Sequence, residues 1–327
     1  MSGVAAHPET ITQDLDLEPY RRELTGYCYR MLGSGFDAED AVQETMVRAW
    51  KSAERLQERG ALKSWLYRIA TNVCYDMLQG SQKRARPMDM GPASTAESGL
   101  DAGLPEEMWI QPVPDANLDP AELAASKETL RLAFVAALQH LPARQRAVLI
   151  LREVLRWQAT EVAELLGTSV ASVNSALQRA RATMDELALD TSGPASVDDG
   201  EQQELLSQYV DAFERYDVAQ LVTLLKDDVV FNMPPFALWL RGPDDVAKWM
   251  VGPGIGCKDA KLITTHANGC PAVAIYKPSE PGVWEPFNLA VLEISDGEIS
   301  NITNFLSPEL FPAFGLPRRI TDSSSTG

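Results

Sequence analysis

Two neighbouring helical patterns between residues 37 and 78 constrain this chain more than any other feature. In DAEDAVQETMVRAW, Val42, Thr45 or Met46, and Ala49 recur at the spacing of one helix face. Acidic residues occupy the first turns, where the helix dipole favours negative charge. The opposite, polar face is expected to hold Asp37, Glu39, Asp40, Gln43, Glu44 and Arg48.

The second pattern, LKSWLYRIATNVCYDML, combines basic and aromatic residues with an apolar stripe of Leu66, Ile69, Val73 and Met77. Aromatic rings, a guanidinium and short polar side chains suit stacking on unpaired bases and hydrogen bonding to their edges. The residues expected to flank the stripe or face outward are Trp65, Tyr67, Arg68, Asn72, Tyr75 and Asp76. The alternative is an ordinary two-helix unit whose aromatic residues are half-buried core.

A second signal lies in residues 141–184, where two helical patterns flank Gly167-Thr168 and Ser169 has the side chain of an N-cap. This is the spacing of a helix-turn-helix. The second helix is expected to expose residue types that bond to base edges and phosphates, namely Ala171, Ser172, Asn174, Ser175, Gln178, Arg179 and Arg181. The alternative is a plain helical hairpin with a solvated face.

The net charge of −17 is unusual for a DNA-binding protein, because phosphate neutralisation supplies much of the affinity for DNA. The charge is segregated along the chain. Residues 18–86 and 127–184 have net charges of +3 and +4, whereas residues 87–126 and 185–327 have −8 and −13. The two candidate DNA-binding modules are therefore the positive parts, which favours a protein that needs a partner to dock it on DNA.

Residues 87–126 are rich in Gly, Pro, Ser, Ala and acids, which predicts an extended linker. Within it, Trp109, Ile110 and Val113 lie among prolines and indicate a short docking motif. The alternative is a passive tether whose Trp109 packs on a neighbouring domain. Residues 190–200 form a second expected linker.

Residues 201–316 begin with two helical patterns and continue with short β-like runs. Asp296-Gly297 between two apolar runs is a signal for a hairpin turn. Helices followed by strands indicate an α+β domain. The predicted fold is therefore multidomain, with two all-α modules, the second a helix-turn-helix, followed by an α+β domain.

With these motifs in this order, the chain resembles the extracytoplasmic-function sigma factors, the promoter-recognition subunits of bacterial RNA polymerase. Its α+β part resembles the cone-shaped SnoaL-like fold, and MPPFALWLRG, ANGCPAVAIYK and SPELFPAFGLP resemble the SigG-like subgroup that has this appendix. The resemblance implies sigma region 2 at 18–86, sigma region 4 at 127–189 and a SnoaL-like regulatory domain at 201–327. It also implies that the linker at 87–126 threads the polymerase channel, where a polyanion could lie in a positive groove.

The same resemblance implies core RNA polymerase and promoter DNA as partners, with three sets of contact residues. The polymerase clamp is expected to contact Asp40, Gln43, Glu44 and Arg48. The melted −10 region is expected near Trp65, Tyr67, Arg68, Asn72 and Asp76. The −35 region is expected at Ser172, Asn174, Ser175, Gln178, Arg179 and Arg181.

Some relatives of the SnoaL-like fold are enzymes with an Asp or His base inside the cone. The pocket candidates here are Phe231, Trp239, Trp249, His266, Tyr276, Trp284, Phe287, Asn288 and Asn304. A lone His266 is more often a structural residue, so we expect no catalytic residue, although a small ligand is an open alternative. Cys257, His266 and Cys270 lack the spacing of a zinc site, and we expect no cofactor or metal.

The sequence contains no signal-peptide pattern and no apolar run of membrane-spanning length, so we expect a cytoplasmic protein. The leading interpretation is an alternative sigma factor regulated in cis by its C-terminal domain. The second is a ligand-sensing or enzymatic SnoaL-like domain fused to a helix-turn-helix regulator. Residues 37–78 favour the first, because a repressor needs neither a clamp-binding helix nor a strand-melting helix.

Overall fold

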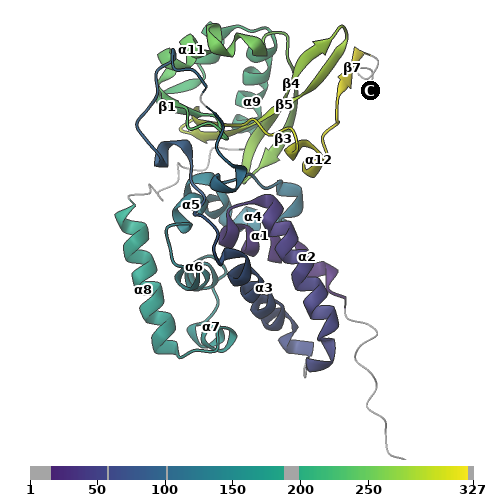
Figure 1. Cartoon of the computed structure of the whole chain (residues 1–327), viewed down its shortest axis with the longest axis vertical. Coiled ribbons are helices and arrows are strands. Elements are labelled where there is room, and N and C mark those ends of the chain that lie inside the picture. Colours follow the sequence, from purple (N-terminus) through teal and green to yellow (C-terminus); the bar gives the residue numbers. More distant parts are fainter. Residues whose placement is uncertain (1–15, 57–58, 101, 188–198, 323–327) are drawn as a thin grey trace, which may run out of the picture. The chain divides into compact units, whose positions relative to one another are not determined.

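The computed structural model describes residues 16–56, 59–100, 102–187 and 199–322 (Figure 1). The chain forms two compact units. The first joins residues 1–81 to residues 141–186, and the second joins residues 82–140 to residues 187–327. In the described residues the first unit is helical, and the second contains a β-sheet with helices on it.

The first unit starts with a 3-10 turn at Glu18–Tyr20 and three helices, α1 (Arg21–Leu32), α2 (Gly35–Lys51) and α3 (Leu62–Leu78). Helix α1 ends where Gly33 adopts a φ of 74°, a conformation that glycine tolerates. The next residue, Ser34, caps α2, because its Oγ accepts a hydrogen bond from the Asp37 amide at 3.2 Å. Leu24, Tyr27 and Leu66 are fully buried where these helices pack.

The second half of this unit is made of α6 (Ala143–Leu149), a π-helical turn at Ile150–Val154, α7 (Ala159–Leu165) and α8 (Val170–Glu186). Gly167 has a φ of 59°, and Ser169 Oγ accepts from the Ser172 amide at 3.2 Å, so the predicted turn and cap of the helix-turn-helix are confirmed. The buried Arg146 guanidinium donates to the carbonyls of Met31 and Leu141. Burial lowers the pKa of Arg146 to about 10, and the two carbonyls accept from its Nη1 and Nη2 atoms.

The second unit contains a seven-stranded sheet in the order β2-β1-β6-β5-β4-β3, with β7 paired to β5. Strands β1 and β6 are parallel, and the other neighbouring pairs are antiparallel. The strands are β1 (Leu225–Asn232), β2 (Trp239–Arg241), β3 (Lys261–Ala267), β4 (Cys270–Glu280), β5 (Val283–Ser295), β6 (Glu298–Phe305) and β7 (Ile320–Thr321). Asp296 and Gly297 have φ values of 55° and 81° between β5 and β6, which confirms the predicted hairpin turn.

Three helices pack on this sheet: α9 (Asp199–Glu214), α10 (Val218–Val222) and α11 (Pro243–Val251). Their buried side chains Leu206, Leu221 and Trp249 share one apolar cluster with Val273 of β4 and Ile302 of β6. A short helix, α12 (Leu310–Ala313), precedes β7. We call residues 199–322 the cone domain. Its helices followed by strands are the α+β arrangement that the sequence predicts.

Residues 82–140 pack with the cone domain, so the extended linker predicted for residues 87–126 within them is not what the structure shows. We call these residues the docked segment; it contains 3-10 turns and two short helices, α4 (Pro120–Ser126) and α5 (Leu132–Leu138). Trp109, Ile110 and Val113, the predicted docking motif, are at most 3% exposed. Burial of these apolar side chains outweighs the linker-like composition around them. Composition alone did not show this, because the contacts come from residues far along the chain.

The docked segment is attached to the cone domain by hydrogen bonds along its length. The Ser94 amide donates to the Trp239 carbonyl at 2.8 Å, and the Leu104 amide donates to the Pro235 carbonyl at 2.9 Å. The Val113 amide donates to Asn268 Oδ1 at 3.1 Å. These bonds fix the segment at several points along its length, so it is an integral part of the second unit.

Candidate nucleic-acid interface

Helix α8 exposes the polar face predicted for the second helix of the helix-turn-helix. Asn174, Ser175, Gln178 and Arg179 are exposed, and their spacing places them along one side of the helix. Val173, Ala176, Leu177 and Ala180 are buried on the opposite side. Amide and guanidinium groups on an open helix face can form paired hydrogen bonds with adenine and guanine.

Two other residues predicted to contact the −35 region are less available for contact with DNA. Ser172 is half-buried, and its amide donates to Ser169 Oγ in the cap of α8. Arg181 is exposed but forms an ion pair with Glu153 in the π-helical turn. This ion pair holds the Arg181 side chain beside its own module, so a contact with phosphate requires the pair to open.

Helix α3 presents four of its five predicted −10 residues on one stripe. Trp65, Arg68, Asn72 and Asp76 are three or four residues apart, which is the spacing of one helix face. Arg68, Asn72 and Asp76 are exposed and Trp65 is half-buried. Arg68 also donates to the Glu164 carbonyl of α7 at 3.2 Å. The stripe therefore combines one large ring with polar groups able to bond to base edges.

Tyr67, the fifth residue, is buried, and its prediction as an outward contact is wrong. Its ring packs against Tyr27 and Trp157, with centroid distances of 5.2 and 5.0 Å. Its hydroxyl donates to Glu23 Oε1 at 2.9 Å. Because the ring contacts two other aromatic rings and the hydroxyl has a partner inside the unit, Tyr67 stabilises the helical packing. The sequence did not reveal this, because Trp157 is distant along the chain.

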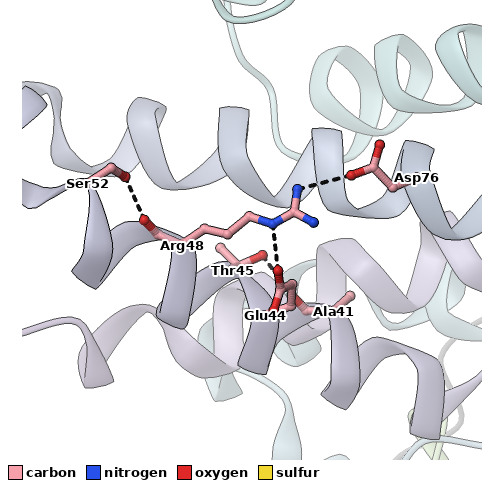
Figure 2. A network of polar contacts seen from close by, with 6 residues as sticks. All are labelled: Ala41, Glu44, Thr45, Arg48, Ser52 and Asp76. Atoms are coloured by element: carbon pink, nitrogen blue, oxygen red, sulfur yellow. Dashed lines mark hydrogen bonds and ion pairs between the residues drawn. The ribbon is translucent and has the colours of Figure 1, made fainter.

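Helix α2 exposes Asp40, Gln43 and Glu44, as predicted for its polar face. Arg48 lies in an ion-pair network with residues of two helices (Figure 2). Its Nε donates to Glu44 Oε1 at 2.7 Å and its Nη1 donates to Asp76 Oδ2 at 3.0 Å. These hydrogen bonds raise the pKa of Arg48, which keeps it charged. Arg48 thus connects the predicted clamp-binding residues of α2 to the predicted −10 residues of α3.

Trp50 is a surface residue that the sequence reasoning missed. It lies near the end of α2 and is 72% exposed, the largest value among the exposed large apolar side chains of the described residues. It follows Asp40, Glu44 and Val47 at helical spacing, so it extends the polar face of α2. An exposed Trp at the rim of a polar face is typical of a protein-binding surface. The position of Trp50 directly after Ala49, a residue of the apolar stripe, could have indicated that its ring lies at the surface.

A cavity of about 60 Å³ lies in the apolar cluster of the cone domain. Of the predicted pocket residues, Phe231, Trp249, Phe287, Asn288 and Asn304 line it. The structure therefore brings together the rings and the two amides, as a ligand pocket requires.

The other four predicted pocket residues lie elsewhere in the second unit, which corrects their assignment to the cavity. Trp239 donates from Nε1 to the Gly91 carbonyl at 3.0 Å, and Tyr276 donates to the Pro317 carbonyl at 2.8 Å. Trp284 donates to the Asp259 carbonyl at 2.9 Å. In each case the polar atom of the ring side chain donates a hydrogen bond to the backbone of another loop or chain segment. The sequence pattern placed these rings on strands without showing which face they occupy.

His266, the remaining candidate, is exposed at the end of β3. It borders a polar hollow of about 570 Å³ that Asp115 and Lys127 of the docked segment also line. Burial raises the pKa of Asp115, although the Gly269 amide donates to it and His266 opposes the shift.

Among the described residues, no cluster of His, Cys, Asp and Glu has the arrangement of a metal site. Within the same residues, no helix combines the length and apolar character needed to cross a bilayer.

Comparison with known proteins identifies both helical modules. Residues 17–84 match the family model described as Sigma-70 region 2, and residues 131–184 match that of Sigma-70, region 4. The ECF RNA polymerase sigma factor SigG of Mycobacterium tuberculosis is 44% identical over 306 residues, which cover 92% of this chain and 82% of the relative. SigJ of the same organism is 26% identical over 330 residues, which cover 95% of this chain and 97% of SigJ.

The crystal structure of the M. tuberculosis extracytoplasmic-function sigma factor SigJ has the same fold. It aligns over 92% of this chain and 98% of its own with a TM-score of 0.59, at 22% sequence identity. Both helical modules are thus matched by family models, and the identity to SigG extends through the cone domain. The chain belongs to the extracytoplasmic-function RNA polymerase sigma factors.

Proposed function

We propose that the three exposed helix faces divide the work of a sigma factor, which binds core RNA polymerase and recognises promoter DNA. Asp40, Gln43 and Glu44 of α2 would contact the polymerase clamp. Trp65, Arg68, Asn72 and Asp76 of α3 would meet the melted −10 strand, and Asn174, Ser175, Gln178 and Arg179 of α8 would enter the −35 major groove. The supporting observation is that all of these side chains are exposed or half-exposed, on faces opposite the buried core. The functional modules are 18–86 and 127–189, and their residues 82–86 and 127–140 belong to the docked segment in this structure.

Transcription reconstituted with core polymerase tests these roles separately. Gln178→Ala and Arg179→Ala should reduce initiation roughly ten- to hundred-fold, since a good paired contact to a base contributes about 1–3 kcal/mol. Asn72→Ala and Trp65→Ala should impair opening while upstream binding is retained. A premelted bubble should rescue the α3 variants and leave the α8 variants impaired. Failure of the bubble to rescue Asn72→Ala and Trp65→Ala would contradict the melting role.

A DNA-binding regulator that acts without polymerase is the second candidate function. The open α8 face is compatible with it, but the exposed polar face of α2 would then have no role. Specific binding of the promoter duplex by the full chain alone, at affinity typical of repressors, would favour this candidate. The sigma assignment predicts weak binding until core polymerase is added.

The cone domain regulates in cis by holding the docked segment, which connects the two sigma modules along the chain. Residues 87–126 have a net charge of −8 and are expected to thread the polymerase channel. The bonds to Trp239, Pro235 and Asn268 hold this stretch on the cone domain. Threading therefore requires release from the cone domain, so the docked form is the less active one.

Asn268 is the central attachment point of the docked segment. Its backbone amide donates to the Val113 carbonyl at 3.1 Å, and its Oδ1 accepts from the Val113 amide at 3.1 Å. Its Nδ2 donates to the Leu130 carbonyl at 2.7 Å. One fully buried side chain thus bonds to two places in the segment that are far apart in sequence. Loss of this side chain would leave buried backbone groups unpaired.

The docking is expected to depend on pH through Glu106. This carboxyl accepts from Ser307 Oγ at 3.4 Å, and hydrogen bonding to Glu309, together with burial, raises its pKa to about 7. The docked state therefore retains a proton that the released state loses above the ordinary value of 4.5. The stabilisation of the docked state by the Glu106 carboxyl is complete below pH 4.5 and is lost as the pH rises through about 7.

Hydrogen exchange of the Leu104 amide, corrected for its intrinsic pH dependence, measures this effect. Protection should fall from about pH 5 to about pH 8 in the natural chain. Glu309→Gln should flatten the change, because the amide removes the second negative charge. Glu298→Gln, an exposed acid on β6, serves as the matched control and should keep the natural profile. An unchanged profile in Glu309→Gln would exclude the carboxyl pair as the cause.

We assign no catalytic step to the cone domain and place the action of the protein with RNA polymerase in the cytoplasm. His266, the candidate general base, is exposed and lies outside the cavity. A general base must lie within hydrogen-bonding reach of a bound substrate. Incubation with candidate ligands followed by product analysis should therefore detect no turnover.

A further inference from the structure

The cavity of about 60 Å³ has apolar walls that include two amide groups. Phe213 of α9, Trp249 of α11 and Ile302 of β6 supply apolar surface from three elements. Asn288 of β5 and Asn304 of β6 line the same cavity. Asn288 is 3% exposed, so its polar atoms are removed from solvent and need partners within the fold.

Hydrogen bonding fixes the orientation of both amides. Asn304 Nδ2 donates to the Asn232 carbonyl at 3.3 Å, and a carbonyl can only accept. Asn304 therefore presents its Oδ1 to Asn288, whose Nδ2 donates to it at 2.8 Å. Asn288 Oδ1 is then the remaining acceptor, and it has no hydrogen-bond partner. A buried acceptor of this kind indicates a missing donor.

We propose that this cavity binds a small neutral molecule with an apolar body and one O–H or N–H donor, which bonds to Asn288 Oδ1. A carboxylate is excluded, because it would place a charge among apolar walls that include no Lys or Arg and against another acceptor. A cavity of about 150 Å³ accommodates benzene with its six non-hydrogen atoms, so the present one suits roughly two or three. Short-chain alcohols have this size and chemistry.

The cavity wall is connected to the docked segment through two chain positions. Met233 and Leu306 line the cavity, and the Leu306 amide donates to the Pro234 carbonyl at 3.0 Å. The adjacent Pro235 carbonyl accepts from Leu104 of the docked segment at 2.9 Å. A ligand that displaces Met233 or Leu306 therefore shifts an acceptor that holds the segment. This coupling rests on the proposed regulation by docking, whereas the binding site does not.

Methionine methyl NMR on the full chain tests the binding site directly. Two of the ten methionines, Met233 and Met250, line the cavity, and Met31 of α1 serves as an internal reference. Titration with ethanol should shift Met233 and Met250 and leave Met31 unchanged, with affinity on the order of millimolar for so few atoms. Dimethyl ether, an isomer without a donor, should bind at least fivefold more weakly. Formate should not bind.

Asn288→Leu removes the acceptor and should abolish the preference for the alcohol over the ether. His266→Ala, outside the cavity, is the control and should bind as the natural chain does. Absence of shifts with ethanol, which would mean a water-filled cavity only, overturns the proposal. Equal affinity for alcohol and ether overturns the role of Asn288, and this comparison holds even if Asn288→Leu does not fold.

The coupling has its own readout in the exchange of the Leu104 amide. Saturating ethanol should change that exchange at least threefold in the natural chain and have no effect in Asn288→Leu. Binding without any change in the exchange of the Leu104 amide would support the ligand site but overturn the coupling between this site and the docked segment. Whether docking regulates transcription is measured separately, in transcription assays without ligand.

Discussion

Trp50→Ala is expected to weaken binding of core RNA polymerase by about 30-fold or more, because Trp residues that become buried in protein interfaces often contribute about 2 kcal/mol or more. Trp50 is 72% exposed and continues the polar face of α2. Burying its ring against the polymerase removes a large apolar surface from water. Fluorescence anisotropy with labelled chain and core enzyme measures the dissociation constant.

The control for this experiment is another exposed apolar residue. Val251 at the end of α11 is 62% exposed and belongs to the cone domain, so Val251→Ala should bind core polymerase as the natural chain does. Both variants should melt at nearly the natural temperature, since exposed side chains contribute little to stability. Natural core affinity in Trp50→Ala would exclude this end of α2 from the polymerase interface.

Asn268→Gly should release the docked segment and raise transcription several-fold. The substitution removes the bonds from the side chain to Val113 and Leu130, and each unpaired buried group costs roughly 1–3 kcal/mol. Glycine accepts the φ of 59° found at this position, so the backbone is not strained. Multiple-round transcription from the same promoter, at equal concentrations of holoenzyme, measures the change.

Asp296→Gly is the matched control for Asn268→Gly. Asp296 also has a positive φ, 55°, at a hairpin turn of the same sheet, but its side chain bonds to Lys226 and Ser295 within the cone domain. It should leave transcription unchanged. Reduced transcription in Asn268→Gly, with normal core binding, would mean that docking activates the protein.

Features encoded by neighbouring residues could be predicted from the sequence. Ser169 caps α8 through a bond to an amide three residues away, and Asp296-Gly297 forms a turn through its own φ preferences. The outward residues of α8 followed from helical periodicity alone. Such signals require no knowledge of distant contacts.

Features that depend on distant residues could not be predicted in this way. Tyr67 has the composition of a base-stacking residue, yet Trp157 from another module covers it. Trp239 and His266 lie on strands whose buried face was not evident, and the first is fastened to Gly91. The docked segment has the composition of a linker, and the cone domain, which is distant in sequence, supplies partners along it.

Hydrogen exchange in the assembled holoenzyme tests the central claim, that the cone domain holds the docked segment until the protein works with polymerase. The amides of Ser94, Leu104 and Val113 bond to the cone domain and should be protected in the free chain. In holoenzyme engaged at a promoter, their exchange should become faster at all three positions together, while the Leu306 amide stays protected. Unchanged or greater protection at these three amides in transcribing complexes would contradict the account.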